Sequence, residues 1–133
     1  MRSLRTLVLA MALAVPTAPV AWSHSLKDLQ TQLGDREKYL QAIRIDPIFI
    51  EAHYNIGQIY LFRKNDLAKA ADAFSEVLRL DPQHVGSNLY LGYIYMERGD
   101  KARARSYLTT VLNAAPGNQR ALDMLRELDT AVR

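Results

Sequence analysis

The chain has 133 residues, of which 49% are hydrophobic and 23% charged, as in one globular domain and unlike a disordered or fibrous protein. Its formal net charge is +3, and it contains no cysteine, which excludes disulfides and thiol chemistry. Its stability must therefore come from packing.

Residues 1–23 differ in composition from the rest of the chain. A short basic start is followed by the apolar run TLVLAMALAV and then by prolines and small residues, an order typical of a secretory signal peptide. The run is short for a membrane span, although an uncleaved membrane anchor is an open alternative. We predict cleavage after Ser23, with Ala21 as the second choice, and a periplasmic or secreted protein.

Loss of this segment would change the charge of the chain. Arg2 and Arg5 are its basic residues, and without them 15 basic residues face 14 acidic ones, so the net charge falls from +3 to +1. Nucleic-acid binding needs a basic patch or stripe on the folded domain. The charge therefore does not indicate a nucleic-acid partner.

His24 suggests an alternative function. Cleavage after Ser23 would leave its imidazole beside the free amine, and cleavage after Ala21 would leave Trp22-Ser23-His24; both arrangements can chelate Cu(II). A copper-binding envelope protein is therefore the alternative hypothesis. The remaining histidines, His53 and His84, are isolated and predict no metal site, and we expect no other cofactor.

Residues 24–47 predict a degenerate helical hairpin, with a short helix over 26–33 closed by Gly34 and a second helix that ends in the phrase IRIDP. A residue before proline is pushed out of the α region, and proline offers no amide to continue the ladder. The phrase therefore ends a helix.

The same phrase recurs along the chain. IRIDP ends at Pro47, LRLDP at Pro82 and the weaker LNAAP at Pro116, at spacings of 35 and 34 residues. Such a period is the mark of a repeat array. The extra residue fits the turn RKND at 63–66, where the second copy has RGD at 98–100, because loops accept insertions.

Each copy, at 48–82 and 83–117, contains two stretches with apolar residues three and four positions apart, which predicts a helical hairpin. Gly57 and Gly92 would each cost about 1 kcal/mol relative to alanine inside a helix. They predict that another helix packs too closely there for a Cβ, with Ala70 and Ala104 as small partners.

The copies resemble tetratricopeptide repeats. The matching positions are Ile56-Gly57-x-x-Tyr60, Ala70, Phe74 and Pro82 in the first copy, and Leu91-Gly92-x-x-Tyr95, Ala104, Leu108 and Pro116 in the second. The family's usual tryptophan is replaced by His53 and Asn88. The resemblance implies an all-α fold in which tetratricopeptide-type hairpins stack as a short right-handed solenoid, closed by a C-terminal capping helix at 118–133 with a polar outer face.

The array is small, at about two and a half repeats plus a cap, and about three units are needed to bury the repeat faces. Homo-oligomerisation through an array end is therefore an open alternative. The sequence has no phosphate-binding loop, nucleophile elbow or H-E-x-x-H motif, so we do not expect an enzyme.

The resemblance also implies a function. In such arrays the first helix of each hairpin lines a concave groove, which here predicts a non-catalytic adaptor or scaffold of the cell envelope that binds a peptide segment or helix of a partner protein. Tyrosine combines a large area with a polar tip, and methionine repacks easily. The candidate groove residues are Tyr54, Asn55, Gln58, Phe62, Tyr90, Tyr93, Met96 and Arg120. Core packing is the alternative for Leu61, Leu89 and Met96.

Overall fold

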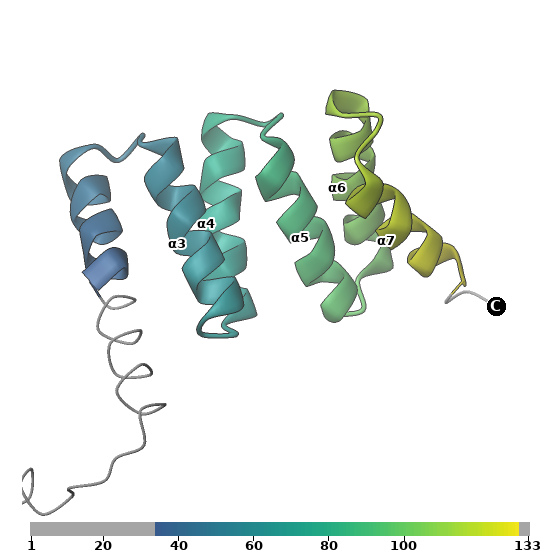
Figure 1. Cartoon of the computed structure of the whole chain (residues 1–133), viewed down its shortest axis with the longest axis horizontal. Coiled ribbons are helices and arrows are strands. Elements are labelled where there is room, and N and C mark those ends of the chain that lie inside the picture. Colours follow the sequence, from purple (N-terminus) through teal and green to yellow (C-terminus); the bar gives the residue numbers. More distant parts are fainter. Residues whose placement is uncertain (1–33, 131–133) are drawn as a thin grey trace, which may run out of the picture. The chain divides into compact units, whose positions relative to one another are not determined.

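The computed structural model describes residues 34–130, and the regular structure among them is helical (Figure 1). Residues 34–45 are helical, and five helices follow: α3 (Ile50–Phe62), α4 (Leu67–Leu80), α5 (Val85–Glu97), α6 (Lys101–Ala114) and α7 (Gln119–Thr130). The chain divides into two compact units, Met1–Asp35 and Arg36–Arg133. Of the first unit only Gly34 and Asp35 lie in the described range, and both are helical, so Gly34 does not end a helix there.

The predicted signal peptide, its cleavage site and the predicted helix at 26–33 lie outside the described residues, as do the last three positions of the predicted capping segment. Between residues 34 and 130, no helix combines the length and the apolar character that a bilayer span requires.

The second unit is a stack of helical hairpins. Helix α3 packs against α4 and α5 against α6, while α4 packs against α5 and α7 against both α6 and α5. Figure 1 shows this succession along the chain. The prediction of stacked α-hairpins followed by a further helix is confirmed.

The second helix of each hairpin begins in the same way. The Asp66 carboxylate accepts a hydrogen bond from the backbone N–H of Lys69 at 3.0 Å, and Asp100 accepts one from that of Arg103 at 3.0 Å. The residues before these caps, Asn65 and Gly99, have φ of 50° and 75°. This left-handed conformation suits glycine and asparagine. The two acids are thus N-caps that fix a sharp turn.

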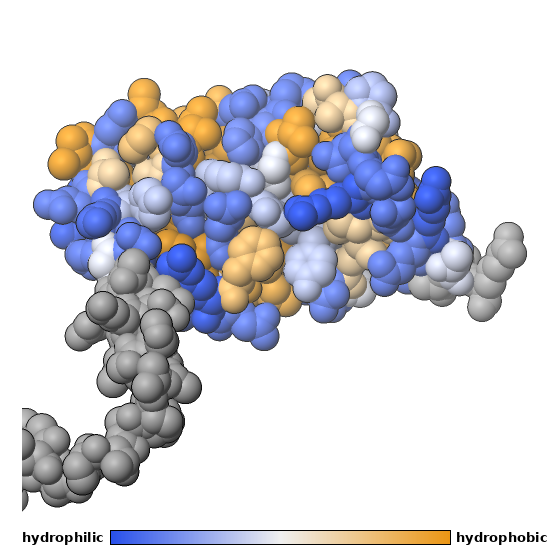
Figure 2. Space-filling model, viewed as in Figure 1, coloured by the Kyte–Doolittle hydropathy of each residue, from blue (hydrophilic) through white to orange (hydrophobic). Residues whose placement is uncertain are grey.

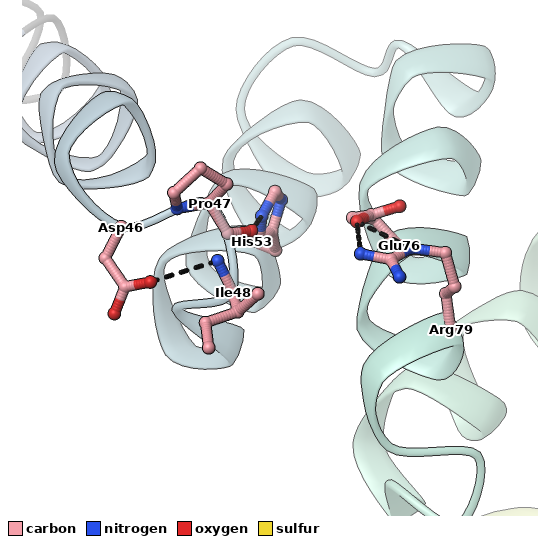
Figure 3. Close-up of polar contacts among 6 residues, drawn as sticks. All are labelled: Asp46, Pro47, Ile48, His53, Glu76 and Arg79. Atoms are coloured by element: carbon pink, nitrogen blue, oxygen red, sulfur yellow. Dashed lines mark hydrogen bonds and ion pairs between the residues drawn. The ribbon is translucent and has the colours of Figure 1, made fainter.

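The Asp-Pro phrase forms the turn between hairpins. The carboxylates of Asp46 and Asp81 accept the backbone N–H of Ile48 and Gln83, each at 3.1 Å. Figure 3 shows the first of these contacts. Each aspartate therefore stabilises the turn that follows its helix, as expected of residues that separate one hairpin from the next.

Two buried clusters form the core, and α5 contributes to both. The first joins α3, α4 and α5 through Leu61, Ala70, Ala71, Phe74, Leu91 and Ile94. The second joins α5, α6 and α7 through Leu89, Ala104, Leu108, Val111, Ala121 and Leu128.

Gly57 and Gly92 lie where the two helices of a hairpin approach closely, as predicted. A Cβ at Gly57 would lie 2.6 Å from the Phe74 ring, and one at Gly92 would lie 2.7 Å from the Leu108 side chain. The nearest partners are thus large side chains and not the alanines that we expected, although the backbone oxygen of Ala104 also lies 3.7 Å from the Cβ position of Gly92. Each glycine makes room for a large buried side chain one helical turn beyond Ala70 or Ala104.

Candidate peptide-binding groove

Helices α3, α5 and α7 form a pocket of about 390 Å³. This volume is at the lower end of the range for ligand pockets. We call it the α3–α5–α7 pocket. It is lined by Leu61, Phe62, Leu89, Tyr90, Tyr93, Arg120 and Met124.

Two aromatic side chains of the lining remain open to solvent. Phe62 is 64% exposed and Tyr93 is 40% exposed. The Phe62 ring meets the Tyr90 ring edge to face, with centroids 5.4 Å apart. Figure 2 shows hydrophobic side chains at the surface between the lower ends of α3 and α5 in that view. Exposed apolar surface in a concave site is typical of a binding surface.

The inner wall of the pocket is held by aromatic packing. Tyr90 stacks on the fully buried Phe74 with ring centroids 5.1 Å apart. The side-chain amide of Gln58 donates a hydrogen bond to the Tyr90 hydroxyl at 3.4 Å. The position of Tyr90 is therefore set by α3 and α4 before any ligand arrives.

Tyr54 lies beside the pocket and packs between the hairpins. Its ring centroid is 4.8 Å from that of His84, 5.8 Å from that of Phe74 and 6.0 Å from that of Tyr90. Burial raises the pKa of Tyr54 from 10.0 to about 12, with Tyr90 as the next cause, while the positive charge of Arg120 acts in the opposite direction. Tyr54 is thus largely a packing residue.

The predicted groove residues fall into two groups. Phe62, Tyr90, Tyr93 and Arg120 meet in the α3–α5–α7 pocket. The others do not line it: Tyr54 and Gln58 contact Tyr90, Asn55 is half-buried on α3, and Met96 packs against the second core cluster.

The pocket lining also includes two residues for which the sequence left core and groove as alternatives, and one residue that was not predicted. Leu61 and Leu89 are 5% and 8% exposed, so they belong to the core and to the pocket wall at once. Met124 was not among the candidates. Its position four residues after Arg120 was the available signal, because such residues share a helix face.

The described residues hold no group of three or more histidine, cysteine or acidic side chains that could bind a metal ion. His24, the candidate copper ligand, lies outside the described residues. The Nδ1 of His84 accepts the backbone N–H of Ser87 at 3.1 Å, and the Nε2 of His53 donates to the carbonyl oxygen of Pro47 at 2.9 Å. Both imidazoles thus stabilise local backbone structure.

Comparison with known families decides the classification. The profile of the tetratricopeptide repeat matches residues 61–128, half of the chain, and a second profile of that family matches residues 36–85. The chain belongs to the tetratricopeptide repeat (TPR) family. One curated relative of this TPR protein is a probable UDP-N-acetylglucosamine–peptide N-acetylglucosaminyltransferase, SPINDLY, of Eustoma exaltatum subsp. russellianum, with 32% identity over 110 residues. The match covers 76% of the chain and only 12% of the relative.

Solved structures show the same fold. The first TPR domain of Spaghetti (RPAP3), bound to an HSP90 peptide, has 18% identity and a TM-score of 0.71 and covers 82% of this TPR protein and 86% of that chain. The Yersinia enterocolitica chaperone SycD, in complex with a peptide of the translocator YopD, has 15% identity and a TM-score of 0.67, with coverage of 87% and 98%. YrrB, described as a TPR protein with an unusual peptide-binding site, has 20% identity and a TM-score of 0.64, with coverage of 76% and 52%. The predicted fold is thus confirmed.

Proposed function

We propose that this TPR protein is a non-catalytic adaptor that holds a peptide segment or helix of a partner protein in the α3–α5–α7 pocket. The observation that carries the proposal is the apolar pocket with Phe62 and Tyr93 open to solvent at its surface. The similar structures that contain bound peptides support the same use of the scaffold.

The pocket suits binding because its wall is already ordered. Tyr90 is held between Phe74 and Phe62, and Leu61 and Leu89 are packed into the core clusters. A partner would therefore order few of these side chains on binding. Preorganisation of this kind lowers the entropic cost of association.

A crosslinked pull-down tests the proposal. The variant Phe62→Ala/Tyr93→Ala removes two exposed rings of the pocket. The matched control, Ile45→Ala/Ile48→Ala, removes two exposed apolar side chains that do not line it. We expect wild type and control to capture a protein that the pocket variant loses. Equal capture by all three would exclude the pocket, and self-crosslinks alone would indicate a homo-oligomer.

Tyr54 is left intact in this experiment. Because it packs against Phe74 and His84, its removal would disturb the contact between hairpins as well as the pocket. Circular dichroism of each variant would verify that the helical content is unchanged.

The proposal includes export to the cell envelope. Its support is the layout of residues 1–23, with a basic start, an apolar run and small residues near Ser23. Fractionation and intact-mass measurement of the protein from its native cells test this part. We expect a chain that begins at His24; an intact chain in the cytoplasm would contradict export.

A further inference from the structure

The lining of the α3–α5–α7 pocket contains one charge. Six of its seven residues are apolar or aromatic, and the seventh is Arg120. Arg120 is exposed, and its side chain makes no hydrogen bond or ion pair with another residue of the described part of the chain. The pocket therefore combines apolar walls with an unneutralised cation.

Five other cations of the array are paired with acids. Lys69, Arg79, Arg103, Arg105 and Arg126 each have a carboxylate within 3.6 Å. Figure 3 shows one example, in which Arg79 lies against Glu76. Lys38, Arg44, Lys64 and Arg98 have no such partner among the described residues, and neither has Arg120. Of these unpaired cations, Arg120 is the one that lines the pocket.

The acid nearest to Arg120 along α7 is already engaged. Asp123 accepts a hydrogen bond from the side-chain amide of Gln119 at 2.8 Å and another from Arg126 at 3.3 Å. Its carboxylate thus faces two donors of its own helix. Arg120 therefore remains available to an acid from outside the chain.

The position of Arg120 in α7 adds to the positive potential. It lies in the first turn, which contains no acidic residue. Backbone amides at a helix N-terminus carry a partial positive charge, and an acidic residue there would normally offset it. The helix and the guanidinium therefore both favour an anionic group at this edge of the pocket.

We propose that the α3–α5–α7 pocket selects a protein segment in which a bulky apolar side chain is followed or preceded closely by an aspartate or glutamate. This rests on the proposed peptide-binding function and specifies its partner. The apolar side chain fills the space beside Phe62 and Tyr93, and the carboxylate accepts hydrogen bonds from Arg120. A guanidinium suits this contact because its paired N–H groups match the geometry of a carboxylate.

The two elements must be close together in the partner. Arg120 and Phe62 line the same pocket of about 390 Å³. In an extended segment side chains two positions apart point to the same side, so we expect the apolar anchor and its acid about two residues apart. The proposal specifies a side-chain carboxylate within a chain, not the carboxylate at a chain end.

Selection from a library of displayed random segments tests the proposal. The chain continues at both ends of each segment, so no terminal carboxylate is presented. The proteins are wild type, Arg120→Glu and Arg98→Glu. The last is the control, because it makes the same charge change at an exposed arginine outside the pocket lining and leaves the contact between Arg126 and Asp123 intact.

We expect wild type and Arg98→Glu to enrich an apolar residue with an acid close to it in the sequence, and Arg120→Glu to replace that acid by lysine or arginine. Enrichment without a charged neighbour, or the same acidic preference in all three proteins, would overturn the inference and leave the binding function standing. No enrichment by any of the proteins would instead refute the proposed function.

A binding cycle with one selected peptide, blocked at both ends, gives the quantitative test. The Asp/Glu→Asn/Gln change in the peptide and Arg120→Gln in the protein should each weaken binding by up to about fivefold, the upper end of the range for an exposed ion pair. The two changes together should weaken it no further. Independent, multiplicative losses would show that the two groups do not meet, and would overturn the inference.

Discussion

His53 and Asn88 each donate a hydrogen bond to the carbonyl oxygen of the proline six residues earlier. The distances are 2.9 Å from His53 Nε2 to Pro47 and 3.1 Å from Asn88 Nδ2 to Pro82. Figure 3 shows the His53 contact. These are the two positions at which the sequence departs from the family's usual tryptophan. The replacement residues therefore tie the turn between hairpins to the helix that follows it.

The two positions should differ in their effect on stability. Asn88 is 2% exposed and also donates to the His84 carbonyl at 3.0 Å, whereas the His53 bond is exposed. Loss of buried hydrogen bonds costs about 1–3 kcal/mol. We expect Asn88→Ala to lower the free energy of unfolding in urea by about 2 kcal/mol, and His53→Ala by less than about 1 kcal/mol. Equal losses would contradict the role assigned to burial.

Tyr54 makes stability depend on alkaline pH. Burial, with Tyr90 as the next cause, raises its pKa from 10.0 to about 12 in the folded state. Between these values the unfolded chain has lost the phenolic proton while the folded chain retains it, so ionisation favours unfolding. The stabilisation is complete below pH 10 and is lost as the pH rises through about 12.

The variant Tyr54→Phe isolates this effect. Its free energy of unfolding should fall less than that of wild type between pH 9 and pH 12, because phenylalanine has no proton to lose. Tyr107, whose pKa burial also raises, is present in both proteins and cancels in the comparison. Parallel pH profiles would show that Tyr54 ionises alike in both states.

At the scale of the helices, α3 is the exception in how it begins. Side chains cap the other four: Asp66 for α4, His84 for α5, Asp100 for α6 and Asn118 for α7. The N-cap of α3 is Phe49, which makes no side-chain capping bond and is 41% exposed. The backbone N–H of Ala52 donates instead to the Phe49 carbonyl oxygen at 3.1 Å, so the start of α3 lacks the side-chain partner that its neighbours have.

Phe49→Asn should supply that partner. The gain expected from a capping side chain is about 1 kcal/mol in the free energy of unfolding, measured by urea denaturation. Phe49→Ala is the matched control, because it also removes the ring but cannot cap the helix. Equal stability of the two variants would mean that the cap adds nothing at this helix.

The sequence could predict the hairpins but not which side of a helix faces the groove. Helices α3 and α5 carry apolar residues on nearly all sides, because each packs within its hairpin, against the next hairpin and along the pocket. Their periodicity therefore does not separate Tyr54, which packs between hairpins, from Tyr93, which is open. The sequence also does not show how far one helix of a hairpin is shifted along the other. We therefore predicted Ala70 as the residue opposite Gly57, whereas the structure places Phe74 there.

At the scale of the whole array, α5 links the repeats. It contributes Leu91 and Ile94 to the first core cluster and Leu89 to the second. Helix α7 closes the second cluster with Ala121 and Leu128. In a repeat protein each unit is stabilised largely by contact with its neighbours. A loss of packing at α7 should therefore reach the first hairpin through α5.

Leu128→Ala tests this coupling. Leu128 is 4% exposed in the last turn of α7, and truncation of such a residue costs about 2–5 kcal/mol. The control is Glu127→Ala, an exposed neighbour whose loss should cost less than about 0.5 kcal/mol. We expect Leu128→Ala to unfold at lower urea in one transition.

Two spectroscopic probes decide whether that transition includes the whole array. Far-ultraviolet circular dichroism follows all helices. The near-ultraviolet tyrosine signal follows α3 to α6 and the helical residues 34–45, which contain Tyr39, because α7 contains no aromatic residue. If α5 couples the repeats, both signals shift together to lower urea. If α7 melts alone, part of the helical signal is lost at lower urea while the tyrosine signal keeps the wild-type midpoint. In that case the α7 wall of the pocket can unfold independently of the α3 and α5 walls. Since α7 provides Arg120 and Met124, the same result would also predict weaker binding by the Leu128→Ala variant at urea concentrations where α3 to α6 remain folded.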